Sequence, residues 1–173
     1  MRSTALALPG VLLIQPDVYA DERGCFWEAW SACTSGLSCT FVQDNCSFSQ
    51  AGVLRGLHAQ HEPYAQAKLV GVLNGAAFDV AVDVDERSPT FGQYVSALLT
   101  GENHHMLFIP AGYAHGFLAL EDTLLSYKCS APYSPNHEYG IRYDDPALAI
   151  AWPQTPRLVS PKDLALPFTK WRG

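Results

Sequence analysis

The sequence predicts an all-β protein of the jelly-roll barrel class, and three observations favour that class. Apolar stretches rich in Val, Leu, Phe and Tyr recur at close spacing, turn signals separate them, and long helical periodicity is missing. About ten such stretches in one chain are typical of a β-sandwich or barrel. We therefore expect one domain, residues 1–173, whose strands surround a central cavity lined by inward-facing polar side chains.

The expected strands are short and follow one another closely along the chain. In order, they are residues 10–14, 25–30, 40–48, 67–73, 76–84, 93–100, 104–110, 115–120 and 123–129. Turn signals such as ADERG, LNG, DERSPTFG, TGEN and PAG lie between them. Residues 76–84 alternate cleanly, so one face of that strand is expected to be buried and the other to face solvent or a cavity. A short helix is expected after Ser160, which can cap it, with Pro161 at its first position.

Composition and charge narrow the classes of function. Hydrophobic residues make up 48% of the chain and charged residues 16%, which is typical of a globular protein rather than a disordered one. The net charge of −6 argues against a nucleic-acid partner, because such proteins usually carry a basic face. No segment approaches the ~20 apolar residues that a membrane span requires, so no membrane partner is expected.

The N-terminal segment and the cysteines indicate the compartment. The first twenty residues have an early Arg and a V-x-A ending, faintly like a signal peptide. Pro9 and Gly10 break the apolar run, so a strand entering the domain is the better interpretation. The five cysteines form no C-x-x-C pair, so neither a disulfide framework nor a structural zinc site is expected. We therefore expect free thiols and a cytoplasmic protein.

Several polar side chains lie on expected strands beside strongly apolar neighbours. They are Lys68, His115, Tyr127 and Lys128 in the strands above, and Arg55 and His58 in the apolar, glycine-framed run of residues 52–60. Lys and Arg are almost never buried unless paired, so the plain alternative is that each side chain points outward. That alternative suits Lys128, because Tyr127 and Lys128 must face opposite sides of a strand.

The spacing of Arg55 and His58 is odd, so a regular strand would send their side chains to opposite faces. Gly56 lies between them, and a glycine inside a strand is typical of a bulge or bend that re-aims the next side chain. The two residues are therefore either unrelated positions or a functional pair on one face.

The segment PAGYAHGF, residues 110–117, delivers His115 from a tight turn into the next strand. This spacing resembles the second half-motif of the cupins, which are jelly-roll barrels and in which that His often binds a metal. The first half-motif of a metal cupin needs H-x-H followed by Glu. Here His58 and His61 are three apart, and Lys68 occupies the expected Glu position. A cation there would repel a divalent metal, so no metal site is expected.

From Gly10 to Asp163 the chain resembles the dTDP-4-dehydrorhamnose 3,5-epimerases, the RmlC family. The matching stretches occur in order: DERGCFWE, FVQDN, GVLRGLH, QAKLV, FDVAVDV, SPTFG, EN, IPAGYAHGFLAL, YK, YSP, DDPALAIAWP and LVSPKD. The resemblance implies a cupin-type jelly roll that forms a homodimer and uses no metal or organic cofactor. The implied reaction inverts C3 and C5 of dTDP-4-dehydro-6-deoxy-D-glucose to give dTDP-4-dehydro-L-rhamnose.

The resemblance also implies a role for individual residues. His58 would be the base, Tyr127 the acid, and Asp163 the partner of the base, while Lys68 and His115 would stabilise charge at the ketone oxygen. Substrate contacts would fall on Arg23, Phe26, Glu28, Gln43, Asn45, Arg55, His115, Tyr133, Glu138 and Lys162. Among these, Tyr133 would stack on the thymine, and the N-terminal residues Phe26 and Glu28 would reach the partner's site.

The implied chemistry suits these residue types. A C4 ketone acidifies the C–H bonds at C3 and C5, so a base can remove a proton to give an enolate and an acid can return one to the opposite face. Histidine has an unperturbed pKa of ~6.5, which suits a base, and tyrosine, at ~10, keeps its proton until the enolate takes it. The ketone is already present in the substrate, so no hydride carrier or electron sink is required.

Four positions depart from the family pattern. Ala59 stands where an aromatic residue is usual, Cys46 replaces a His, QAK replaces QGK, and Pro132 precedes the stacking tyrosine. None of these changes removes a base, an acid or a charge-stabilising group, but they could alter the shape of the pocket.

Three alternatives stay open at this point. Relatives that act at C3 alone, on related nucleotide 4-keto sugars, share the same catalytic set. A metal-dependent cupin such as a dioxygenase would use His58, His61 and His115. A sugar-binding cupin without turnover would bind dTDP and exchange no substrate proton.

Overall fold

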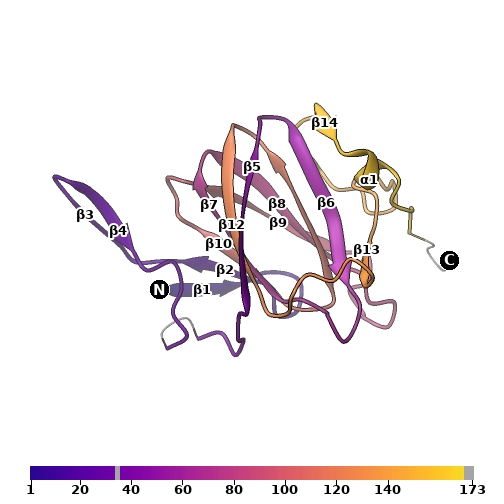
Figure 1. Ribbon diagram of the computed structural model, residues 1–173, viewed down its shortest axis with the longest axis horizontal. Coiled ribbons are helices and arrows are strands. Elements are labelled where there is room, and N and C mark those ends of the chain that lie inside the picture. Colours follow the sequence, from indigo (N-terminus) through magenta and orange to yellow (C-terminus); the bar gives the residue numbers. More distant parts are fainter. Residues whose placement is uncertain (34–35, 170–173) are drawn as a thin grey trace.

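Two six-stranded sheets face each other, and a two-stranded hairpin projects from one end of them (Figure 1). The computed structural model describes residues 1–33 and 36–169. The neighbouring strands in both sheets run antiparallel, apart from one short parallel pair. The predicted all-β, jelly-roll class is confirmed.

The first sheet supplies one wall of the molecule. Its order is β1 (Arg2–Ala5), β2 (Leu12–Gln15), β10 (Met106–Ile109), β7 (Lys68–Asn74), β12 (Thr123–Cys129) and β5 (Gln43–Ser49). The N-terminal segment therefore enters the domain as strands, as expected. Within the described part of the chain, β5 forms one edge of this sheet and β1 the other.

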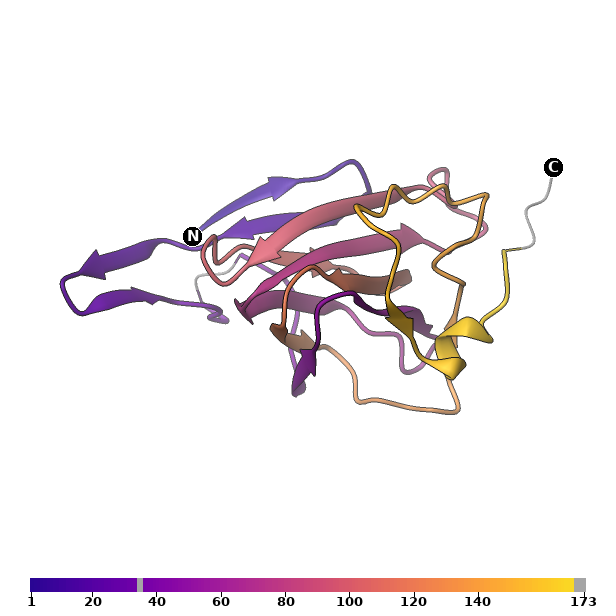
Figure 2. The ribbon, with the colours of Figure 1, turned by 90° about the horizontal axis from the view of Figure 1, so that it is seen from above.

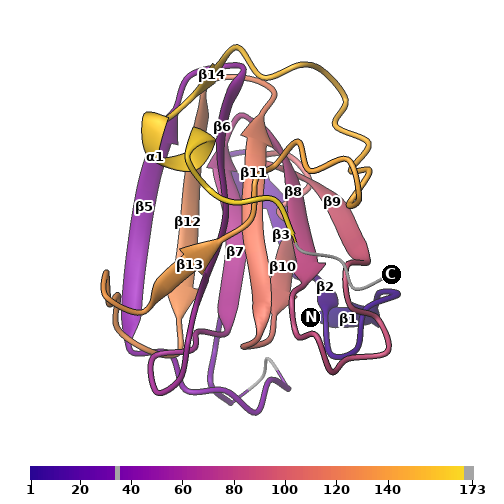
Figure 3. The ribbon, with the colours of Figure 1, turned by 90° about the vertical axis from the view of Figure 1, so that its right-hand side faces the viewer.

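The second sheet supplies the opposite wall. Its order is β13 (Glu138–Gly140), β6 (Val53–Gln60), β11 (Tyr113–Ala119), β8 (Ala76–Asp83) and β9 (Tyr94–Thr100), with the short β14 (Leu158–Val159) pairing with β6 in parallel. Helix α1 (Pro161–Leu164) follows β14 and lies at the opposite end of the molecule from the hairpin formed by β3 (Val18–Asp21) and β4 (Gly24–Trp27) (Figure 2). Figure 3 views the molecule from the end that carries α1.

The main core lies between the two sheets. Val70, Val72 and Leu125 from the first sheet pack with Ala77 and Phe117 from the second. This packing fixes the distance between the sheets, and it leaves the polar cavity described below at one side. Among the described residues, no helix combines the length and the apolar character needed to cross a membrane.

Strand β8 is buried on both faces. Val80 and Val82 pack on the outer side of the sheet against Ile141 and Leu148, so neither face of β8 meets solvent. Asp79 lies on the inner side and is fully buried. Solvent exposure of the polar face of residues 76–84 is therefore wrong: that face is buried, and Asp79 lies behind the cavity wall rather than in its lining.

A bulge in β6 confirms the interpretation of the Arg55–His58 spacing. Between Arg55 and His58, β6 contains one more residue than the stretch of β11 that it pairs with. Gly56 has a φ of +125°, and a Cβ there would lie 2.5 Å from the Cα of Gly116. Arg55 and His58 line the same cavity, which shows that the extra residue turns both side chains to one face.

All the strands expected from the sequence are present, with shifted ends, and the structure adds elements that carry little apolar signal. Every residue of β1 and of β3 is exposed, so neither strand shows a buried face in its sequence. β13 and β14 contain three and two residues, too few for a pattern. The expected helix after Ser160 is confirmed as α1, with Ser160 as its N-cap.

Candidate active site

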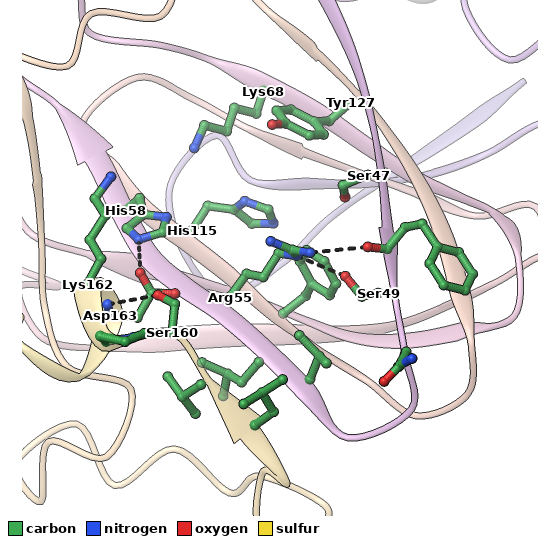
Figure 4. A pocket seen from close by; sticks show the side chains of 18 residues that line it. Ser47, Ser49, Arg55, His58, Lys68, His115, Tyr127, Ser160, Lys162 and Asp163 are labelled. Carbon is green, nitrogen blue, oxygen red and sulfur yellow. Dashed lines mark hydrogen bonds and ion pairs between the residues drawn. The ribbon is translucent and has the colours of Figure 1, made fainter.

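A cavity of about 720 Å³ lies between the sheets, within the range of sites that bind small molecules (Figure 4). Both walls and α1 contribute polar side chains to it. They are Arg55 and His58 from β6, Lys68 from β7, His115 from β11, Ser47 and Ser49 from β5, Tyr127 from β12, and Lys162 and Asp163 from α1. The sequence separates these residues widely, and the two sheets bring them together.

His58 and Asp163 form a hydrogen-bonded pair on one wall. His58 Nε2 lies 2.7 Å from Asp163 Oδ1, and the Gly56 N–H donates to Asp163 Oδ2 at 3.2 Å. The cap of α1 aims the carboxylate inward, because the backbone N–H of Asp163 donates to Ser160 Oγ at 3.0 Å. Only 4% of Asp163 is exposed.

Asp163 is held as a carboxylate. Burial alone would raise its pKa, but the hydrogen bonds from His58 and from the Gly56 N–H favour the charged form, and the pKa lies below its usual value. A neutral His58 that donates from Nε2 to this carboxylate keeps the lone pair on Nδ1. The pair can therefore accept a proton from a ligand and stabilise the resulting imidazolium.

His115 has a buried carboxylate of its own. Its Nε2 lies 2.9 and 3.1 Å from the two oxygens of Asp79, which is fully buried. This arrangement fixes the His115 ring at the cavity wall. Sequence reasoning missed Asp79, although an Asp inside the apolar run AFDVAV was a visible signal, since an unpaired carboxylate is almost never buried.

Lys68 and Tyr127 come from the first sheet and face the second. Burial lowers the pKa of Lys68, and the charges of Cys129, Asp79 and Glu138 offset that effect only in part. Burial raises the pKa of Tyr127, so its hydroxyl stays protonated in the free protein. The cavity thus holds a phenol donor and an amine opposite the His58 wall.

The neighbouring residue, Lys128, points the other way, as expected from strand alternation. It forms an ion pair with Asp44 at 2.5 Å and lies over the Trp30 ring on the outer side of the sheet. Tyr127 is therefore directed inward by the same strand that sends Lys128 outward.

Arg55 keeps its guanidinium in the cavity through neutral partners. Its Nε donates to Ser49 Oγ at 2.9 Å, and a terminal nitrogen donates to the Phe48 carbonyl at 3.1 Å. The described part of the chain gives Arg55 no carboxylate partner. Its charge is therefore available to an anionic or strongly polar ligand.

A chain of hydrogen bonds runs along the rim beside α1. Gln43 donates to Asn45 at 3.0 Å and accepts from the backbone N–H of Tyr133 at 2.9 Å. The Tyr133 hydroxyl donates to Glu138 at 3.0 Å, and Lys162 also donates to Glu138. Burial would raise the pKa of Glu138, but these two donors lower it overall. The Tyr133 ring stays 52% exposed, so one face can stack on a flat ligand.

Three expected contact residues lie in or just after the β3–β4 hairpin, apart from this cavity. Arg23 lies in the β3–β4 hairpin and pairs with Asp21, Phe26 of β4 is 68% exposed, and Glu28 follows the hairpin (Figure 1). The hairpin extends away from the body that contains the cavity. Within one chain these side chains therefore remain apart from the rest of the predicted site.

The histidines of the metal-dependent alternative are not brought together. His61 stacks on Tyr139 with ring centroids 3.9 Å apart, outside the cavity that His58 and His115 line. Across residues 1–33 and 36–169, no group of three His, Cys, Asp or Glu side chains is placed to hold a metal ion. The three histidines that the metal-dependent alternative needs therefore do not line one site.

The departures from the family pattern lie outside the cavity lining. Ala59 is buried in the outer cluster with Leu57, on the face of β6 away from His58. Cys46 is exposed on the outer face of β5. The Pro132 carbonyl accepts a hydrogen bond from Gln60 at 3.2 Å, in the loop behind Tyr133. These substitutions therefore leave the lining side chains unchanged.

Comparisons with known proteins agree on one family. The family model described as dTDP-4-dehydrorhamnose 3,5-epimerase matches residues 5–170. Curated proteins of that name from Sinorhizobium fredii and Salmonella typhimurium are each 48% identical to this chain. The first alignment covers 96% of this chain and 89% of the relative, and the second covers 94% and 92%.

Solved structures give the same result. The epimerase RmlC from Legionella pneumophila, in complex with dTDP-4-keto-L-rhamnose, is 46% identical with a TM-score of 0.91, over 96% of this chain and 92% of that one. ChmJ from Streptomyces bikiniensis, a 3'-monoepimerase in complex with dTDP-quinovose, is 33% identical with a TM-score of 0.88, over 94% and 85%. The chain is thus more similar to the 3,5-epimerase than to this monoepimerase.

Proposed function

The chain belongs to the dTDP-4-dehydrorhamnose 3,5-epimerase family, and from that premise we propose how its cavity carries out the reaction. The enzyme is an epimerase that inverts C3 and C5 of dTDP-4-dehydro-6-deoxy-D-glucose and yields dTDP-4-dehydro-L-rhamnose. The observation that carries the mechanism is that His58 on one sheet, paired with Asp163 of α1, faces Tyr127 on the other sheet. Because both sheets contribute to this one cavity, we treat residues 1–173 as one catalytic domain.

The first step is proton removal beside the ketone. His58 takes the proton from carbon, and the C–H electron pair moves into the ring to give an enolate with its charge on O4. Asp163 holds the His58 ring and stabilises the imidazolium that forms. Its low pKa keeps the carboxylate charged at neutral pH, which that role requires.

The second step returns a proton from the other side. Tyr127 gives its hydroxyl proton to the same carbon on the opposite face, so the configuration inverts. Lys68 and His115, on opposite sheets, stabilise the charge on O4 between the two steps. The raised pKa of Tyr127 keeps the proton in place until the enolate forms. His58 then loses its proton and Tyr127 regains one by exchange with solvent, and the same sequence at the second carbon completes the reaction, with no cofactor required.

The rest of the nucleotide sugar fits the remaining polar groups. The exposed ring of Tyr133 would stack on the thymine, and Gln43, Asn45, Glu138 and Lys162 surround the space next to it. Arg55 would contact the polar sugar or diphosphate from inside the cavity. The relative from Legionella pneumophila was solved with dTDP-4-keto-L-rhamnose, which supports this ligand class.

A homodimer would complete the site. The hairpin exposes Val18, Tyr19 and Phe26, and a two-stranded ribbon of this kind is rarely stable when it stands alone. A second copy of the chain would cover these side chains and would receive Arg23, Phe26 and Glu28 at its own cavity. We also propose a cytoplasmic location, which the five unpaired cysteines support.

Nuclear magnetic resonance of the substrate in D2O tests this function. The wild-type enzyme should introduce deuterium at both C3 and C5 and form the L-lyxo product. His58→Ala should lower the rate by about 10²–10⁴-fold. His105→Ala is the matched control, because His105 hydrogen bonds to Gln15 outside the cavity and its loss should leave the rate unchanged.

The labelling pattern separates the alternatives. Deuterium at C3 alone would show a C3-only epimerase. No exchange at either carbon would overturn the proposed function, and full activity in His58→Ala would overturn the assignment of the base.

A further inference from the structure

The inner face of β5 carries four polar side chains in alternation, and one of them is not used in the mechanism above. They are Gln43, Asn45, Ser47 and Ser49. Gln43 and Asn45 hydrogen bond to each other, and the Ser49 hydroxyl accepts from Arg55. Ser47 Oγ is buried and has no hydrogen-bond partner within the described part of the chain.

Ser47 lies beside the reaction centre. In the β5–β12 pairing, Tyr127 lies opposite Asn45 and Leu125 lies opposite Ser47, so Ser47 and Tyr127 are diagonal neighbours on the inner face. Figure 4 shows the Ser47 hydroxyl in the region between Tyr127 and the Arg55 guanidinium. Buried hydroxyls are nearly always hydrogen-bonded in native structures. An unpaired hydroxyl that lines a ligand cavity therefore indicates that the ligand supplies its partner.

We propose that Ser47 Oγ hydrogen bonds to the C2 hydroxyl of the sugar and so sets a preference for 2-hydroxylated substrates. The inference rests on the proposed function. In that substrate C1 carries the diphosphate, C4 carries the ketone and C6 is a methyl group. The C3 hydroxyl changes its orientation when C3 inverts, whereas the C2 hydroxyl is attached to a carbon that does not react. Because strand pairing holds Ser47 in a fixed position, its hydroxyl suits a sugar hydroxyl that keeps its configuration during the reaction.

Ser47→Ala tests the proposal, with Ser96→Ala as the matched control on the exposed face of β9. With the natural substrate, Ser47→Ala should raise KM by about three- to tenfold and change kcat by less, since one neutral hydrogen bond is lost. With the 2-deoxy analogue of the substrate, wild type and Ser47→Ala should have equal KM. The affinity for dTDP, which lacks the sugar, should be the same in both.

Stability gives an independent measurement. Removing an unpaired buried hydroxyl should leave the melting temperature of the ligand-free protein unchanged or slightly higher. A lower melting temperature would mean that Ser47 already has a structural partner such as a bound water, and would overturn the proposal.

Two kinetic outcomes would also overturn it. The first is an unchanged KM in Ser47→Ala with the natural substrate. The second is an equal rise in KM with the 2-deoxy analogue, which would place the hydroxyl against another atom. Failure of the proposed function is distinguishable, because it would appear as wild-type protein that introduces no deuterium at C3 or C5.

Discussion

Substituting Gly116 by Ala should disable the enzyme by moving the base, although Gly116 carries no chemistry of its own. A Cβ at this position would lie 2.6 Å from the Arg55 carbonyl oxygen and 3.0 Å from the Gly56 Cα. Ordinary contacts between non-bonded carbons fall at roughly 3.5–4.0 Å, so β6 and β11 must separate by up to about 1 Å where β6 bulges. That bulge is what turns Arg55 and His58 to the same face.

Both stability and activity should respond to this separation. Overpacking of this kind costs about 1–3 kcal/mol of unfolding free energy. A displacement of about 1 Å at the catalytic base can lower the rate about 100-fold. Urea denaturation would give the first quantity, and steady-state kinetics, corrected for the folded fraction, would give the second.

Gly71→Ala is the matched control for this experiment. Gly71 lies in a strand of the other sheet, and its closest contact with an added Cβ would be the flexible Met106 side chain, at 3.0 Å. Its effect on kcat should therefore be small. Normal kcat per folded molecule in Gly116→Ala would refute the argument that the close approach of the two strands positions His58.

Three further predictions follow from the site. Tyr127→Phe should remove epimerisation while the fold survives. Slow deuterium exchange without inversion should remain visible by NMR, because proton removal by His58 needs no acid. An inverted product would contradict the assignment of Tyr127 as the acid. The folded-state pKa of Asp163 is lowered, so its contribution to stability is complete above the usual value of ~3.9 and is lost as pH falls through the folded value. Urea midpoints should therefore fall below about pH 4 more steeply in wild type than in Asp163→Asn, and equal slopes would argue against a charged Asp163. Phe26→Ala should raise KM if Phe26 acts at the partner's site, and a concentration-independent monomer in sedimentation experiments on the wild type would refute the dimer.

The Arg55–His58 segment shows how far the sequence leads. The odd spacing and the intervening glycine predicted a bulge, and the structure contains it. The need for a second glycine on β11 could not be predicted, because it depends on which strands become neighbours. The tight approach of Gly56 and Gly116 is a property of the pairing rather than of either segment alone.

The two buried carboxylates, Asp163 and Asp79, show a second limit of what the sequence can predict. Asp163 could be assigned from the resemblance, and the capping pattern at Ser160 predicted the helix that carries it. The sequence around Asp79 predicts only an alternating strand, because its partner His115 lies 36 residues away in sequence. Pairs of this kind arise from strand register, which the hydrophobic pattern of one segment does not specify.

The N-terminal contact residues show a third limit of what the sequence can predict. Arg23 and Phe26 lie in the β3–β4 hairpin, which exposes apolar side chains, and Glu28 follows it. Under the proposed dimer their contacts would come from a second copy of the chain, which neither the local sequence nor the fold of one chain describes.

Asp163, the carboxylate proposed to orient the base, lies on a one-turn helix, 105 residues after His58 in the chain. So short a helix has almost no intrinsic stability, and its docking on β6 depends on the Ser160 cap and a few side-chain contacts. Such elements open locally at a lower free energy than the sheets that support them. Mild heating should therefore abolish turnover while the barrel remains intact, with amide hydrogen exchange in residues 160–165 rising first. We therefore expect the fraying of a single turn, rather than the melting of the fold, to set the thermal limit of catalysis in this molecule.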